Sequence, residues 1–284
     1  MNFNLIGAGR LGQNLALCLI HQCDLTLLGI CNRTQASAAH AVSTIQSGRA
    51  LSALTDLSPA DFILITTPDD AISSIVKQLA ECQQIKPGQV IIHCSGVLSS
   101  DILNPLRNKG CFVASVHPLK AFRTHHLQQD ALCGCYCVLE GDTKALSLLK
   151  PLLAQMGAEI IVASTIKKST YHAAAVMASN YLVTLAGCAI ELFTDSGLTD
   201  QQAKIITEHL MQDSLNNLKK TMHPKDALTG PLVRGDIDTV RKHLNGIQSP
   251  QINALYRIAA VATQALTPLS QTMIDVLETY SHAD

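Results

Sequence analysis

Residues 3–12 read Phe3-Asn4-Leu5-Ile6-Gly7-Ala8-Gly9-Arg10-Leu11-Gly12. The apolar start of this run predicts a short strand. Apolar residues at helical spacing then predict a helix: Leu11, Leu15, Ala16, Leu19 and Ile20. Between strand and helix lies the G-x-G-x-x-G pattern of a dinucleotide-binding turn, in which glycines permit the tight turn and a close approach to a pyrophosphate. The helix N-terminus offers unpaired N–H groups to the phosphates. We therefore expect the whole turn to bind a cofactor, through Gly7, Ala8, Gly9, Arg10, Leu11 and Gly12.

The second predicted strand, residues 25–31, ends at Asn32-Arg33-Thr34. An NAD site usually has Asp or Glu at this point to bind the ribose 2′-hydroxyl. This chain has Asn32 and then Arg33, whose guanidinium can bind a 2′-phosphate through two parallel hydrogen bonds. We therefore expect NADP(H) in preference to NAD, with Asn32, Arg33 and Thr34 in the cofactor site. The alternative is that Arg33 is a solvated residue at the start of the next helix.

The composition excludes several classes of protein. The chain has 284 residues, of which 47% are hydrophobic, enough for one large domain or two ordinary ones. A net charge of −1 gives no basic surface for nucleic acid. The ten cysteines are not spaced as a metal site, so no metal is expected. We see no signal peptide and no uninterrupted apolar segment of about 18 residues. We therefore expect a cytoplasmic protein that contacts no membrane.

The order of the predicted elements indicates two domains. Up to residue 164, strands and helices alternate, which predicts a doubly wound, mostly parallel α/β sheet of the Rossmann type with ligands at the carboxyl ends of its strands. From residue 165 to 284 only helices are expected, beginning with a long, Ala-rich, apolar helix over residues 169–192. We expect this second domain to bind substrate and to form a homodimer, because its first helix is apolar over more than one face.

Polar residues follow three of the predicted strands at the edge where ligands bind. They are Thr66, Thr67 and Pro68 after one strand, Ser95 after a second and His117 after a third. A Ser-Gly pair after a strand, here Ser95-Gly96, can hydrogen-bond a substrate carboxylate or carbonyl. Each residue alone could also belong to an ordinary turn, in which Ser95 caps the following segment.

The first helix of the second domain carries the remaining candidates. Lys168 and His172 are four residues apart and share one helical face, and Asn180 flanks the same stripe. Hydride transfer to a carbonyl or imine leaves an anion that needs a proton, which Lys or His can supply. We expect His172 to donate the proton, Lys168 to polarise the substrate, Ser95 and Asn180 to orient it, and Arg234 to close over it. The alternative is a solvated lysine, a hydrogen-bonded core histidine and a surface arginine.

Several motifs together resemble a known family. They are His117-Pro118-Leu119, Glu140-Gly141-Asp142, Tyr171-His172-Ala173-Ala174, Ser179-Asn180-Tyr181, Leu228-Thr229-Gly230-Pro231 and Arg234-Gly235-Asp236. The chain resembles a bacterial family of Rossmann-like proteins with a helical domain of unassigned function. That family lies within the superfamily of 6-phosphogluconate dehydrogenases and pyrroline-5-carboxylate reductases. In its hydroxyacid members a catalytic Lys precedes an Asn by four positions. Lys168 matches the Lys, with Lys167 as a rival, whereas His172 stands in place of the Asn.

The resemblance implies an NADP-dependent oxidoreductase that transfers a hydride between NADP(H) and a small carbonyl, imine or hydroxyacid. The alternative is a non-catalytic NADP(H)-binding module that senses redox state or holds a partner. The sequence leaves the identity of the substrate open.

Overall fold

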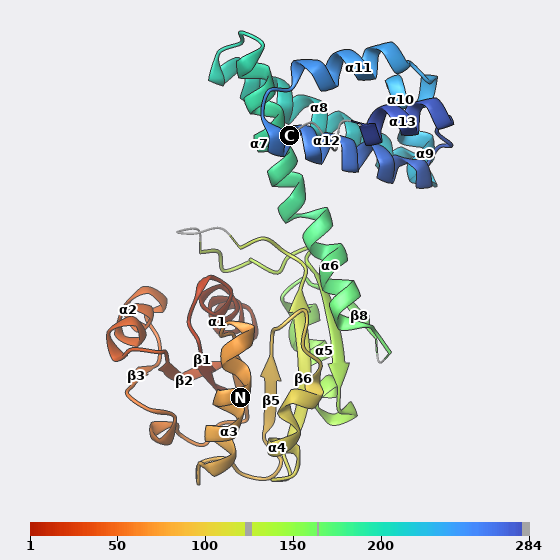
Figure 1. Ribbon diagram of the computed structural model, residues 1–284. Helices are drawn as coiled ribbons and strands as arrows, with labels where there is room; N and C mark the ends of the chain where they lie inside the picture. The colour runs from red at the N-terminus through yellow and green to blue at the C-terminus, as the bar shows by residue number, and fades with distance from the viewer. Residues whose placement is uncertain (123–126, 164, 280–284) are drawn as a thin grey trace. The chain divides into compact units, whose positions relative to one another are not determined.

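The computed structural model describes residues 1–122, 127–163 and 165–279. The chain divides into two compact units, Met1–Ser179 and Asn180–Asp284. The first unit is built on an eight-stranded sheet with the strand order β3-β2-β1-β4-β5-β6-β7-β8 (Figure 1). Its strands are β1 (Asn2–Ile6), β2 (Thr26–Cys31), β3 (Arg49–Leu51), β4 (Phe62–Ile65), β5 (Val90–His93), β6 (Phe112–Pro118), β7 (Tyr136–Gly141) and β8 (Glu159–Val162).

The first six strands are parallel and follow the doubly wound order 3-2-1-4-5-6. Strand β7 then pairs antiparallel with β6, with Ser115 opposite Glu140 and Pro118 opposite Cys137. Strand β8 is parallel to β7. All residues of β4 and β5 are buried, as expected for parallel strands covered on both faces. The predicted Rossmann-type sheet is therefore confirmed, with an antiparallel extension at one edge.

Helices cover both faces of the sheet. One core contains apolar residues of α1 (Arg10–Cys23), α2 (Gln35–Ile45) and α5 (Thr143–Gln155). The core on the other face contains residues of η1 (Leu54–Asp56), α3 (Asp69–Glu81), η2 (Ser100–Leu103) and α4 (Asn104–Arg107). In the sheet, Phe3 of β1 lies opposite Phe62 of β4, and their rings stack with centroids 5.3 Å apart.

Helices and their connecting loops make up the described residues of the second unit, which contain no strand, as predicted. Its own core is small and includes Val240, Leu244, Met273 and Leu277. The helices are α7 (Asn180–Asp195), α8 (Asp200–Lys220), α9 (Pro224–Ala227), α10 (Pro231–Arg234), α11 (Ile237–Gly246), α12 (Pro250–Ala262), η3 (Thr263–Ala265) and α13 (Gln271–Thr279).

The boundary between the units falls at Ser179, not at residue 164 as expected. The single helix predicted over residues 169–192 is interrupted at Ser179, which separates α6 (Lys168–Ala178) from α7. Helix α6 belongs to the sheet unit because its first turn is bonded to the strands, through Lys168 to Ser115 and through Tyr171 to His117. The helix that opens the all-helical region thus brings its polar residues to the sheet.

The segment Lys168–Asp195, formed by α6 and α7, is long and apolar enough to cross a membrane by length and composition alone. The mean hydropathy of its most apolar window is 1.6, and none of that window is buried within the chain. The sequence analysis did not expect such a segment.

Candidate functional site

The glycine turn after β1 has the close contacts that the sequence pattern requires. Gly7 has a φ of +91°, and a side chain there would lie 2.6 Å from Thr67 Cγ2. A Cβ on Gly12 would lie 2.5 Å from the carbonyl oxygen of Gly7 and would also meet Thr66 Oγ1. Helix α1 therefore packs so closely on the turn that only glycine fits at both positions.

The turn is open at Gly9, in contrast to the close packing at Gly7 and Gly12. A Cβ on Gly9 would meet nothing within 4 Å. Gly9 is the N-cap of α1 and provides no side-chain cap, and both Gly9 and Arg10 are exposed. The first turn of an α-helix leaves N–H groups without intrahelical partners. This end of α1 can therefore accept a pyrophosphate.

Asn32 at the end of β2 reaches back to the turn, since its Oδ1 accepts a 2.6 Å hydrogen bond from Ala8 N–H. Arg33 is exposed. Thr34 is the N-cap of α2 and accepts a hydrogen bond from Ser37 N–H at 3.2 Å. The three predicted residues thus lie in order beside the turn, and Thr34 has a structural role as well.

The residues after β4 complete this part of the site. Thr66 Oγ1 donates a 2.6 Å hydrogen bond to the carbonyl oxygen of Gly7. Thr67 Oγ1 is buried and has no hydrogen-bond partner among the described residues. Pro68 is the N-cap residue of α3. A buried hydroxyl without a partner is costly, so the Thr67 hydroxyl is a polar group that a ligand could satisfy.

A second cluster lies at the carboxyl ends of β5 and β6. His117 Nδ1 is 2.7 Å from the hydroxyl of Tyr171 on α6. The imidazole rings of His117 and His172 meet edge to face, with centroids 5.6 Å apart. A Cβ on Gly96 would lie 2.5 Å from His172 Nδ1 and 2.7 Å from His117 Nε2. Both imidazoles therefore pack against Gly96, and any side chain at this position would displace them.

The electrostatics of this cluster favour a neutral His117. Burial, together with the neighbouring His172 and Lys168, lowers the pKa of His117 to about 4, while Asp69 acts in the opposite sense. Burial raises the pKa of Tyr171 to about 12. Tyr171 therefore keeps its proton and can donate it to His117 Nδ1, which leaves the proton of the neutral imidazole on Nε2.

His172 Nδ1 is also buried without a hydrogen-bond partner among the described residues. The Cβ distances from Gly96 place this nitrogen on the same side of the glycine as His117 Nε2. The two imidazoles thus border one small polar region at the edge of the sheet.

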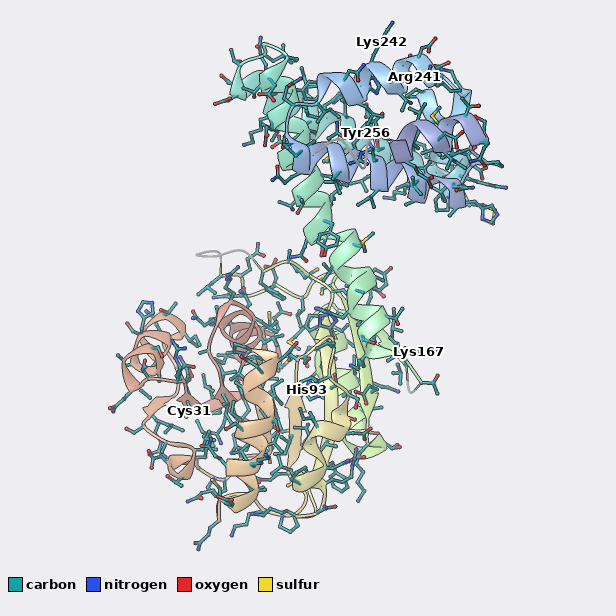
Figure 2. All side chains as sticks on the ribbon, viewed as in Figure 1. Cys31, His93, Lys167, Arg241, Lys242 and Tyr256 are labelled. Carbon is teal, nitrogen blue, oxygen red and sulfur yellow. The ribbon has the colours of Figure 1, made fainter. Side chains whose placement is uncertain are left out.

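His93 and Ser95 hold the turn that carries Gly96. His93 lies at the end of β5 (Figure 2) and is fully buried. Its Nδ1 accepts a hydrogen bond from Ser95 N–H, and its Nε2 is 3.1 Å from the carbonyl oxygen of Ser99. Burial lowers the pKa of His93. The Ser95 hydroxyl oxygen accepts hydrogen bonds from Val97 N–H and Leu98 N–H. Ser95 thus caps the turn, as the alternative interpretation had it, and its hydroxyl proton has no acceptor within the part of the chain that the structure describes.

Lys168 lies in a buried network and not at an open surface. Its side chain is 7% exposed, its Nζ donates a 2.8 Å hydrogen bond to Ser115 Oγ, and its Nζ is 3.5 Å from Glu140 Oε1. Glu140 also accepts hydrogen bonds from Ser100 N–H at 2.7 Å and Ser100 O–H at 2.6 Å. Burial lowers the pKa of Lys168, and Glu140 opposes this shift.

The structure therefore brings together Ser95, His117, Lys168 and His172 in the first unit. Asn180 and Arg234 belong to the second unit, where Arg234 Nε forms a 2.9 Å ion pair with Asp236. Their expected roles stay predictions. Within the described residues, no group of three or more His, Cys, Asp or Glu side chains could hold a metal ion.

The sequence analysis missed Tyr171 and Glu140 as members of the cluster. Both lay within quoted motifs, Tyr171 directly before His172 and Glu140 at the start of Glu140-Gly141-Asp142. The motifs around them drew attention to these two residues. Their contacts could not be predicted, because Tyr171 bonds His117, 54 residues away, and Glu140 pairs with Lys168, 28 residues away.

Comparison with known proteins agrees with this architecture. The model of a Rossmann-like domain matches residues 1–118, and that of a domain of unknown function, DUF2520, matches residues 135–263. The fold and its glycine turn define a Rossmann-like protein with an added helical domain. The chain thus matches the model of a Rossmann-like domain followed by that of a domain of unknown function. No curated protein matches its sequence.

Solved structures share the fold over nearly the whole chain. BF3122 of Bacteroides fragilis, a candidate NADP oxidoreductase, is 19% identical with a TM-score of 0.78, covering 93% of this chain and 98% of its own. TM1727 of Thermotoga maritima is 26% identical with a TM-score of 0.68, covering 93% and 97%. The pyrroline carboxylate reductase of Plasmodium falciparum, solved with NADP bound, is 13% identical with a TM-score of 0.57, covering 98% and 96%.

The lowered pKa of His117 predicts a pH dependence of stability. Between pH 6.5, the ordinary value, and about 4, the unfolded chain binds a proton that native His117 does not. A neutral native His117 therefore costs no stability above pH 6.5. As the pH falls from 6.5 towards about 4, the proton bound by the unfolded chain lowers the free energy of unfolding. Urea unfolding of His117→Gln should show a smaller loss of stability over this window than the wild type. Equal losses in both proteins would contradict the prediction.

Proposed function

We propose that this chain is an NADP-dependent oxidoreductase that transfers a hydride between NADP(H) and a small carbonyl, imine or hydroxyacid substrate. The observation that carries the proposal is the pair of imidazoles over Gly96. They lie at the same carboxyl edge of the parallel sheet as the open glycine turn, where doubly wound folds bind their ligands. The neighbours of this fold that are named for NADP chemistry support the cofactor.

The residues of the turn fit such a cofactor. Gly9 and the uncapped N-terminus of α1 would hold the pyrophosphate, and the unpaired Thr67 hydroxyl would hydrogen-bond the bound molecule. The exposed guanidinium of Arg33 would bind the 2′-phosphate. When bound, the nicotinamide supplies or accepts the hydride.

The two histidines have different roles towards the substrate in this proposal. A neutral His117, with its proton on Nε2, donates a hydrogen bond to the carbonyl oxygen or imine nitrogen and so polarises it. Tyr171 holds His117 in this tautomer through Nδ1. His172 donates the proton that the developing anion needs, because imidazole suits proton transfer near neutral pH. Ser95 can orient the substrate with its free hydroxyl proton.

Cofactor choice is tested by calorimetric titration with NADPH and NADH. We expect tighter binding of NADPH. Arg33→Asp should weaken NADPH binding by about 1.5–3 kcal/mol, the value of a hydrogen bond between charged groups, and leave NADH affinity nearly unchanged. No binding of either nucleotide would overturn the whole proposal, and tighter NADH would overturn only the phosphate role of Arg33.

Catalysis is tested by NADPH oxidation with matched substrates, such as a 2-oxoacid and its methyl ester, and a cyclic imine with and without a carboxylate. With a substrate found, His172→Ala should lower kcat on the order of 10²–10⁴-fold and leave NADPH affinity unchanged. The control His21→Ala changes an exposed histidine on α1. A fully active His172→Ala variant would remove the proton-donor role. NADPH-dependent capture of a partner without any turnover would favour a sensor or scaffold.

We also propose that the helical unit forms a homodimer in a cytoplasmic protein. Large apolar side chains of α7 and α8 are exposed: Val183 by 72%, Ile205 by 57% and Tyr181 by 52%. Such patches mark interaction surfaces, and a second copy would cover them.

Light scattering should give twice the mass of the chain. Val183→Asp should shift the protein towards monomer, whereas Gln201→Asp, at an exposed polar position of α8, should not. If the wild type is monomeric and binds lipid vesicles, the dimer proposal is wrong and the exposed apolar surface contacts a membrane.

A further inference from the structure

Lys168 and Glu140 form a buried charge pair at the junction of four elements. Lys168 opens α6, Glu140 lies on β7, Ser115 on β6 and Ser100 at the start of η2. Ser115 and Glu140 are direct cross-strand partners in the β6–β7 register. Lys168 Nζ contacts both of them, at 2.8 Å from Ser115 Oγ and 3.5 Å from Glu140 Oε1. The pair thus joins the start of α6 to two adjacent strands.

The same network reaches the turn that carries Gly96. Ser115 accepts the hydrogen bond from Lys168 and donates its own proton to the carbonyl oxygen of Ser95, at 3.4 Å. The hydroxyl therefore transmits the position of Lys168 to the residue that precedes Gly96. From the other side, Ser100 gives Glu140 two hydrogen bonds, which fix the carboxylate.

Tyr171 and His172 follow Lys168 by three and four residues, and so lie on the same face of α6, one turn further along. Their contacts are with His117 and Gly96 on the same edge of the sheet. A shift in the first turn of α6 would therefore move both rings relative to His117.

We propose that Lys168 and Glu140 are positioning residues, a buried pair that sets the first turn of α6 so that Tyr171 and His172 meet His117 over Gly96, and that neither side chain touches the substrate. This inference rests on the proposed function for its kinetic consequences only. Two of the three N–H donors of the Lys168 ammonium are directed at Ser115 and Glu140, and its side chain is only 7% exposed, which favours a structural role over contact with the substrate.

The test compares Glu140→Gln, Lys168→Met and the double variant with Lys150→Met, which changes an exposed lysine on α5. Each single change leaves the other charge buried without its partner. We expect kcat to fall by about 100-fold in each single variant, as for a misplaced catalytic group, with NADPH affinity unchanged. The double variant should lose no more than the worse single variant, because the pair acts as a unit.

Imidazole NMR resonances of the ligand-free protein give a readout that needs no turnover. Those of His117 and His172 should shift in Glu140→Gln, and those of the exposed His21 should not. If Lys168→Met fails to fold, Glu140→Gln alone carries the test, since Gln has the shape of Glu. If the wild type turns over no substrate, the proposed function fails and the NMR shifts still test the positioning role.

Two outcomes would overturn the inference. Unchanged imidazole resonances in Glu140→Gln would mean that the pair does not position the rings. Full activity of Glu140→Gln together with an inactive, folded Lys168→Met would mean that Lys168 acts on the substrate itself.

Discussion

Burial of the parallel strands on both faces is the constraint on which the rest of this structure depends. Strands β4 and β5 expose no residue, so their side chains can only form core. Chemistry is then confined to the residues that follow the strands, and parallel strands bring those residues to one edge. The glycine turn after β1, the threonines after β4, the Ser95–Gly96 turn after β5 and His117 at the end of β6 all lie at this edge as a consequence. The doubly wound sheet thus determines where a site can be before any functional side chain is considered.

The antiparallel strand β7 adds what a simple parallel sheet lacks. It places the carboxylate of Glu140 opposite Ser115, within the covered part of the sheet. A buried carboxylate needs a counter-charge and hydrogen bonds, which Lys168 and Ser100 provide. Because Glu140 on β7 needs a positively charged partner, its pairing with Lys168 fixes the position of the first residue of α6. The charge of Lys168 is balanced within the fold, which is why the imidazoles are better placed than the amine to act on a substrate.

The sequence predicted the parts of the structure that depend on local pattern. Apolar periodicity gave the strands and helices of both units, and the spacing of Gly7, Gly9 and Gly12 gave the turn, because close packing there tolerates only glycine at its base. Spacing also paired Lys168 with His172 on one helical face. It could not tell a buried lysine from a solvated one, since that depends on the register between β6 and β7. Nor could it place Tyr171, which contacts a residue 54 positions earlier in the chain. The break at Ser179 was missed because the apolar pattern continues through it.

Two unpaired polar atoms support the argument that this edge of the sheet receives a ligand. Thr67 Oγ1 and His172 Nδ1 are both buried without partners among the described residues, and each such atom costs about 1–3 kcal/mol. Thr67 packs against the glycine turn, and His172 packs against Gly96. In the proposed function, the first would hydrogen-bond the cofactor and the second would serve the group that reacts with it. A ligand that spans the edge would satisfy both atoms, so the cost of leaving them unpaired in the free protein becomes binding free energy in the complex.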